Sequence, residues 1–162
     1  MAIIGDGKLA ALLAQVLLTL TSRLTVLGHR DKRLNFFKDL GIEVKNTRGG
    51  DRLPEKEFDI VVESSGSPDG LPEAIKITRP RGTVILKSTY NDNLHWNPAQ
   101  VVIDETTIIG SRCGPFDKAI ELLSSGKINT KNLLSNIFSL NEWDKAFKQA
   151  MRDDVFKIAL KP

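Results

Sequence analysis

The clearest structural signal in the chain is the hexapeptide Gly5-Asp6-Gly7-Lys8-Leu9-Ala10. It follows a short apolar run at residues 2–4, and leucine and valine residues recur at helical spacing from Leu9 to Leu20. The hexapeptide fits the pattern G-x-G-x-x-G/A, with alanine at the third small position. A buried strand, a glycine-rich turn and an amphipathic helix in this order form the first half of a βαβ unit.

The small residues of this turn have separate roles in binding a phosphate group. Gly5 permits a tight turn, Gly7 lets the backbone approach a pyrophosphate, and Ala10 lets the helix pack closely on the strand. Free N–H groups and the helix dipole favour an anion at this end, beside Lys8 and Leu9. We expect the side chain of Asp6 to point away from that ligand. The alternative is a glycine-rich turn that binds nothing.

Strands and helices alternate along the rest of the chain. Apolar runs predict strands at 23–27, 58–63, 83–86, 107–110 and 156–160, with at most a short strand at 43–46. Helices are predicted at 31–40, from Ser67-Pro68 onward, at 116–125 and at 141–151, and a turn at 79–82. Strands that are apolar throughout indicate a parallel sheet covered on both faces. We therefore expect one α/β domain over residues 1–162, a Rossmann doubly wound parallel β-sheet of about six strands with helices on both faces.

The end of the second strand, Leu27-Gly28-His29-Arg30, bears on which dinucleotide the turn would bind. In NAD-binding domains an acidic residue about 20 positions after the glycine turn accepts hydrogen bonds from the ribose 2′-hydroxyl. Gly28 stands at that position, whereas His29 and Arg30 can donate to a 2′-phosphate. This pattern predicts NADP(H) as the preferred cofactor and NAD(H) as the second choice. Asp31 is the counter-argument, although it could also cap the next helix.

With these residues in place, the sequence resembles the cofactor domain of the medium-chain dehydrogenase/reductase family, the zinc-type alcohol dehydrogenases. The resemblance covers essentially the whole chain and depends on the order of the stretches 3–7, 58–66, 79–83, 110–112, 137–147 and 156–162. It implies an NADP(H)-binding domain of an oxidoreductase that transfers hydride to or from an alcohol or aldehyde. One alternative is a stand-alone NADP(H)-binding sensor or regulatory module. Another is an S-adenosylmethionine-dependent methyltransferase, which Arg30 disfavours.

The resemblance also implies cofactor contacts beyond the glycine turn. The loop after the fourth strand would touch the ribose with Ser64, Ser65 and Gly66. The loops after the fifth and sixth strands would approach the nicotinamide with Lys87, Ser88, Thr89, Ser111 and Arg112. All follow the carboxyl ends of strands, where open α/β sheets bind ligands. The family pairs its cofactor domains through the sixth strand, so a homodimer edge is expected at Thr107, Ile108, Ile109, Gly110 and Ser111.

The chain offers few residues for metal binding or catalysis. Cys113, His29 and His95 have no ligand spacing, so we expect neither a metal site nor a catalytic residue here. Zinc, if it is used, would belong to a GroES-like catalytic domain that is expected to be absent from the chain, and the isolated chain should show little or no turnover. We expect the thiol of Cys113 to be buried or partly buried.

The composition excludes several other classes of partner. A net charge of +3 over 162 residues, with both signs spread along the chain, is too weak to indicate nucleic acid or an anionic membrane. The sequence contains neither an apolar run of membrane-spanning length nor a secretory signal pattern. A single cysteine suits a reducing compartment, so we expect a cytoplasmic location.

Overall fold

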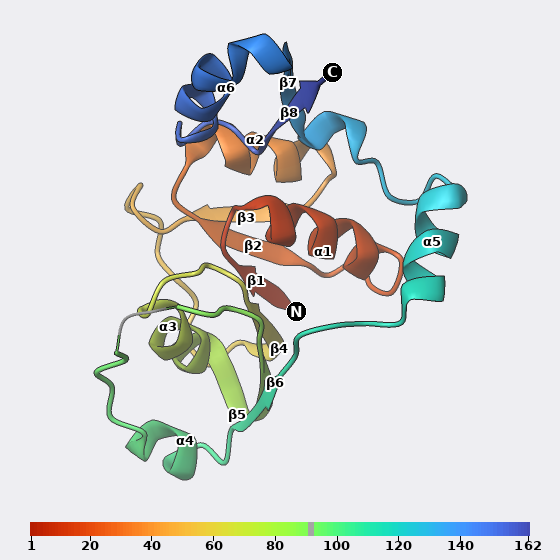
Figure 1. The fold of residues 1–162 in the computed structure, drawn as a ribbon. Helices are drawn as coiled ribbons and strands as arrows, with labels where there is room; N and C mark the ends of the chain where they lie inside the picture. Colours follow the sequence, from red (N-terminus) through yellow and green to blue (C-terminus); the bar gives the residue numbers. More distant parts are fainter. Residues whose placement is uncertain (91–92) are drawn as a thin grey trace.

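A six-stranded parallel sheet forms the centre of the computed structural model, which describes residues 1–90 and 93–162 (Figure 1). The strands run in the order β3-β2-β1-β4-β5-β6. Their bounds are β1 Ala2–Ile4, β2 Thr25–Gly28, β3 Glu43–Asn46, β4 Phe58–Glu63, β5 Thr78–Leu86 and β6 Thr107–Gly110. The chain adds strands on one side of β1 and then crosses to the other side, so the predicted doubly wound α/β fold is confirmed.

Helices cover both faces of the sheet. The helices α1 (Lys8–Leu18) and α2 (Asp31–Asp39) pack on one face, and α3 (Gly70–Ile77) packs on the other. Ile3, Val26 and Val62 belong to the apolar cluster below α1 and α2. Their strand neighbours Leu27 and Val61 belong to the cluster below α3. Alternate residues of β1, β2 and β4 are therefore buried on opposite faces, which is why these central strands are largely apolar.

The first helix is buried through alanines. Ala10, Ala11 and Ala14 are fully buried, whereas the leucines that predicted this helix flank the contact or remain exposed. Small side chains let the helix axis approach the sheet closely. The helix was therefore predicted correctly, but the face that it buries is formed by the alanines and lies beside the stripe of leucines from which the helix was predicted.

Several boundaries differ from the sequence prediction, most of them by one or two residues, and two of the differences have a local structural cause. The helix α3 begins at Gly70 and not at Pro68, because Ser67 and its neighbours form a turn in which the Gly70 N–H donates to the Ser67 carbonyl. The predicted turn at residues 79–82 lies inside the longer strand β5. Phe58 pairs with Thr78, the next pair is Ile60 with Thr83, and the intervening residues bulge out.

The carboxyl-terminal part forms a small unit beside α2 (Figure 1). After α4 (Ala99–Ile103) and α5 (Phe116–Ser124), the chain forms the two-stranded parallel sheet β7 (Leu134–Ser139) and β8 (Lys157–Lys161), joined by α6 (Trp143–Ala150). Short 3₁₀ turns at Lys131–Leu133 and Leu140–Glu142 precede β7 and α6. The final strand thus pairs with β7 within the chain.

The structure also corrects one expectation about a side chain. Cys113 is exposed and not buried, because residues 111–115 leave the sheet edge and run across to α5, away from both apolar clusters (Figure 1). Within residues 1–90 and 93–162, no helix has the length and apolar character needed to cross a membrane.

Candidate functional site

A groove of about 350 Å³ lies at the carboxyl edge of the sheet, where the ends of β1, β2 and β4 meet. The strand order reverses between β1 and β4, and open α/β sheets bind ligands at such a switch point. The lining includes six residues predicted from the sequence, which are Gly5, Gly28, His29, Arg30, Ser65 and Gly66.

The two glycines of the first turn differ in what surrounds them. Gly5 has φ +117°, and a Cβ there would lie 2.8 Å from the backbone oxygen of Ser64. A Cβ at Gly7 would meet no described heavy atom within 4 Å. Gly5 is therefore required by the close approach of β1 and the β4 loop, whereas Gly7 leaves open space at the start of α1.

That open space suits a phosphate group. Gly7 is the N-cap residue of α1, and among the described residues no side chain caps this helix end. Lys8 and Leu9 in the first turn are exposed. Unpaired N–H groups and the positive end of the helix dipole attract an anion there, and the missing Cβ of Gly7 lets it approach. The residues present thus fit a pyrophosphate.

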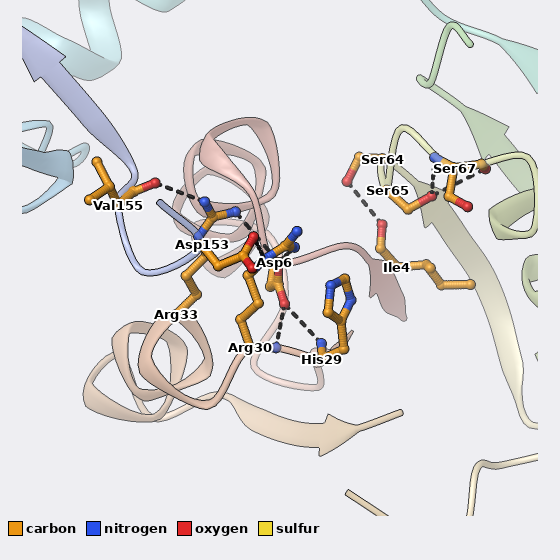
Figure 2. A network of polar contacts seen from close by, with 10 residues as sticks. All are labelled: Ile4, Asp6, His29, Arg30, Arg33, Ser64, Ser65, Ser67, Asp153 and Val155. Atoms are coloured by element: carbon orange, nitrogen blue, oxygen red, sulfur yellow. Dashed lines mark hydrogen bonds and ion pairs between the residues drawn. The ribbon is translucent and has the colours of Figure 1, made fainter. Parts of the chain in front are cut away.

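Asp6 points into the turn between β2 and α2 (Figure 2). Its carboxylate accepts hydrogen bonds from the backbone N–H groups of His29 at 2.8 Å and Arg30 at 2.9 Å, and its other oxygen lies 3.0 Å from the Arg30 guanidinium. Burial raises the pKa of Asp6, but these hydrogen bonds and the arginine charge outweigh it, so the pKa lies below the ordinary 3.8.

Gly28 leaves room for this carboxylate. A Cβ at position 28 would lie 2.7 Å from the Cβ of Asp6 and 2.8 Å from its Oδ2. An acidic side chain at the end of β2 is therefore incompatible with the observed position of Asp6. The carboxylate at this strand end comes from the glycine turn, and it is already bound to backbone N–H groups.

Basic side chains gather next to it. His29 and Arg30 line the groove, together with Thr47 and Arg48 from the loop after β3. Burial lowers the pKa of His29, the charges of Arg30 and Arg48 lower it further, and Asp6 opposes them. Thr47 and Arg48 were not predicted, although the short strand expected at 43–46 would have placed them at this edge.

Asp31 does not cap α2 as the sequence suggested. The N-cap residue is Arg30, and the Asp31 carboxylate accepts a hydrogen bond from the Asn46 side chain at 2.6 Å. Asp31 is therefore held towards the end of β3.

The loop after β4 closes the other side of the groove. The N–H and hydroxyl of Ser64 both donate to the carbonyl of Ile4, which ties this loop to β1. The N–H and hydroxyl of Ser65 donate to the buried carboxylate of Glu63. The loop is thus held rigidly beside Gly5.

Two buried carboxylate oxygens lie close to this loop. Glu63 Oε2 and Glu73 Oε1 have no hydrogen-bond partner among the described residues. Burial raises the pKa of Glu73, and the neighbouring charges of Asp69 and Glu63 raise it further. This part of the groove therefore favours a protonated carboxyl more than an ordinary surface does.

The loops after β5 and β6 meet at the same edge. The Gly66 N–H donates to the Ser88 hydroxyl at 2.8 Å. Lys87 Nζ lies 3.4 Å from the Ser111 hydroxyl and donates to the Arg112 carbonyl at 3.1 Å. The structure thus links the loops that carry the predicted residues Lys87, Ser88, Thr89, Ser111 and Arg112.

Histidine and cysteine do not gather at this site. The described residues contain no group of three histidine, cysteine, aspartate or glutamate side chains that could hold a metal ion. His95 lies in an exposed loop far along the chain from His29. The arrangement is suited to binding an anionic ligand.

A second groove of similar volume lies at the opposite edge of the sheet. It is lined by the first residues of β2, β3 and β4, namely Thr25, Glu43 and Phe58, and by Lys45, Arg52, Leu53, Pro54, Glu55 and Glu57. This edge carries the amino ends of parallel strands and no glycine turn at a helix start. We therefore place the candidate site at the carboxyl edge.

Comparison with known proteins identifies the family of this chain. The pattern of a family described as zinc-binding dehydrogenase matches residues 7–125. D-arabinitol dehydrogenase 1 of Uromyces fabae is 30% identical over 109 residues, which cover 65% of this chain and 31% of that protein. Sorbitol dehydrogenase of Halalkalibacterium halodurans is 26% identical over 175 residues, covering 98% of this chain and 50% of that protein.

Solved structures share the fold. A zinc-binding dehydrogenase from Sinorhizobium meliloti 1021, solved with NADP bound, superposes with a TM-score of 0.88 at 18% identity, covering 99% of this chain and 52% of that one. The matched segments span 31% and 50% of the lengths of the two curated relatives.

Proposed function

The chain belongs to the zinc-binding dehydrogenase family, and from this premise we propose that it holds NADP(H) in an alcohol-dehydrogenase-like oxidoreductase. In that enzyme, hydride would pass between the nicotinamide and an alcohol or aldehyde carbon. The dinucleotide supplies the hydride chemistry when it is bound, and the protein supplies binding and orientation. The observation that carries this proposal is the open space at Gly7, in front of the uncapped start of α1 and beside the groove.

Each part of the dinucleotide has a matching part of the site. The pyrophosphate would lie against Gly5, Gly7, Lys8 and Leu9, where the helix N–H groups can donate to it. Ser64, Ser65 and Gly66 would contact the ribose. The nicotinamide would lie towards Lys87, Ser88, Thr89, Ser111 and Arg112, the loops that hydrogen bonds already join.

The preference for NADP(H) rests on the turn after β2. Gly28 supplies no carboxylate to repel a 2′-phosphate, and the Asp6 carboxylate is engaged by backbone N–H groups. His29, Arg30 and Arg48 are the cationic or donor groups at this end of the groove. A guanidinium and a phosphate form short, charge-assisted hydrogen bonds, which an NAD ribose cannot offer.

We propose that substrate binding and catalysis need a second domain, of the GroES-like type. The described part of the chain offers no cluster of metal ligands, and the two relatives described above are about twice as long as this chain. Zinc, if the enzyme uses it, would be bound by that domain. The 162-residue chain should then bind the cofactor and turn over little or no alcohol.

We further propose that two copies associate through β6. This strand is at the edge of the sheet, and the side chain of Ile109 is 49% exposed. An apolar edge strand with free backbone groups can pair with an identical strand and extend the sheet. The edge consists of Thr107, Ile108, Ile109 and Gly110, followed by Ser111.

Calorimetric titration of the 162-residue chain with NADPH and with NADH tests the cofactor proposal. We expect NADPH to bind more tightly, and Arg30→Ala to weaken NADPH binding about tenfold while changing NADH binding much less. Arg79→Ala is the matched control, because it removes the same charge at the amino edge, where Arg79 pairs with Asp59. Equal affinities for the two cofactors in the unmodified chain would contradict the NADP preference.

A further inference from the structure

The turn between α6 and β8 lies against the proposed 2′-phosphate site, although more than 120 residues separate the two in sequence. Three polar contacts between described residues join them. Arg30 Nε donates to Asp153 Oδ1 at 3.1 Å, Lys32 pairs with Asp154 at 2.9 Å, and Arg33 donates to the Val155 carbonyl at 2.8 Å. Figure 2 shows Asp153 and Val155 beside Arg30 and Arg33.

The guanidinium of Arg30 is shared between two very different carboxylates. Asp6 has 2% of its side chain exposed, and it also accepts hydrogen bonds from two backbone N–H groups. Asp153 has 86% of its side chain exposed, and the hydrogen bond from Arg30 is the contact that holds it at the site. An exposed ion pair contributes little to stability, so breaking it costs little free energy. Breaking the contacts of a buried carboxylate with several hydrogen bonds costs much more. Asp153 is therefore the partner that an incoming anion can replace.

We propose that Asp153 is a specificity-determining residue, which competes with the 2′-phosphate of NADP(H) for the Arg30 guanidinium. A 2′-phosphate carries up to two negative charges, so it attracts Arg30 and repels the Asp153 carboxylate. NAD(H) has a neutral hydroxyl at that position, so it does not displace Asp153 from the Arg30 guanidinium. Asp153 thus lowers the affinity for NADP(H) selectively and moderates the preference that Arg30 creates. This inference rests on the proposed function, because it requires a dinucleotide in the groove.

The test is a titration of the 162-residue chain and its variants with NADPH and NADH. We expect Asp153→Asn to tighten NADPH binding about three- to fivefold, the range typical of one exposed charge interaction, and to change NADH binding less than about twofold. Asp154→Asn is the matched control. It makes the same change in net charge one residue further on, where the carboxylate pairs with Lys32 and Arg152.

Arg30→Ala separates a specific contact from a general change in charge. If Asp153 acts through Arg30, the gain from Asp153→Asn should disappear in the Arg30→Ala background. An equal gain for both cofactors, an equal gain from Asp154→Asn, or no change in the NADPH-to-NADH ratio would overturn the role of Asp153 and leave the proposed function standing. Failure of the unmodified chain to bind either cofactor would overturn the proposed function, and this inference with it.

Discussion

Asp6 occupies the second position of the glycine turn, and only 2% of its side chain is exposed. It keeps its charge because two backbone N–H groups and the Arg30 guanidinium surround it. The sequence predicted the roles of Gly5 and Gly7, because these depend on local backbone geometry. It could not predict the partners of Asp6, which lie 23 and 24 residues away across two strands, nor the contact between Arg30 and Asp153.

Glu73 lines the groove with a carboxylate oxygen that has no hydrogen-bond partner among the described residues. Its folded-state pKa lies above the ordinary 4.5, first through burial and then through Asp69 and Glu63. A carboxyl with a raised pKa contributes stability below the unfolded pKa and loses that contribution as the pH rises through the folded pKa. Glu73→Gln should therefore raise the free energy of unfolding at pH 7, by up to about 1 kcal/mol, and have little effect below about pH 4.5.

Urea unfolding at both pH values measures this effect. Glu55→Gln is the control, because Glu55 is exposed and pairs with Lys76 at 2.9 Å, so its removal should bring no gain. A Glu73→Gln chain no more stable than the unmodified one at neutral pH would show that the carboxylate has a compensating partner.

At the scale of elements, the buried strands were the most predictable part of the chain. The strand β4 begins and ends where the apolar run does, because most of its residues are buried against the layers on either side of the sheet. The edge strand β6 also has the predicted bounds, although its four residues are exposed. The five-residue helix α4 was missed because Val101, Val102 and Ile103 favour strands. It forms because the Asn97 side chain accepts the Ala99 N–H and Gln100 bonds to Asp104.

The position of β6 at the edge of the sheet leads to a testable prediction about the association of two copies. If two copies pair through this edge, Ile109→Lys should place a charge in the contact and shift the chain towards the monomer by about tenfold or more in dissociation constant. Sedimentation velocity over a range of concentrations measures the shift. Leu20→Lys, just beyond the end of α1, is the control, because Leu20 is exposed and lies outside the sheet and outside α5 and α6. A monomeric unmodified chain, or equal effects of the two variants, would contradict pairing through β6.

At the scale of the whole molecule, large apolar side chains remain exposed outside the candidate site. Phe116 on α5, with Trp143 and Phe147 on α6, are all exposed. Such faces commonly mark contacts with another domain or subunit. These exposed side chains agree with our proposal that the cofactor domain works together with a second domain. The sequence predicted helices at these positions, but it did not indicate that their apolar faces would be exposed.

The central claim is that the turn between β1 and α1 binds the pyrophosphate of a dinucleotide, and calorimetric titration of Gly7→Ala with NADPH tests it most directly. A Cβ at Gly7 meets no described atom and its backbone has φ −86°, so the variant should fold with nearly unchanged stability. The same Cβ would stand where the phosphate has to approach, and we expect affinity to fall about tenfold or more. Gly114→Ala, in an equally open loop away from the turn, should bind as the unmodified chain does. Unchanged NADPH affinity in a folded Gly7→Ala chain would contradict the account.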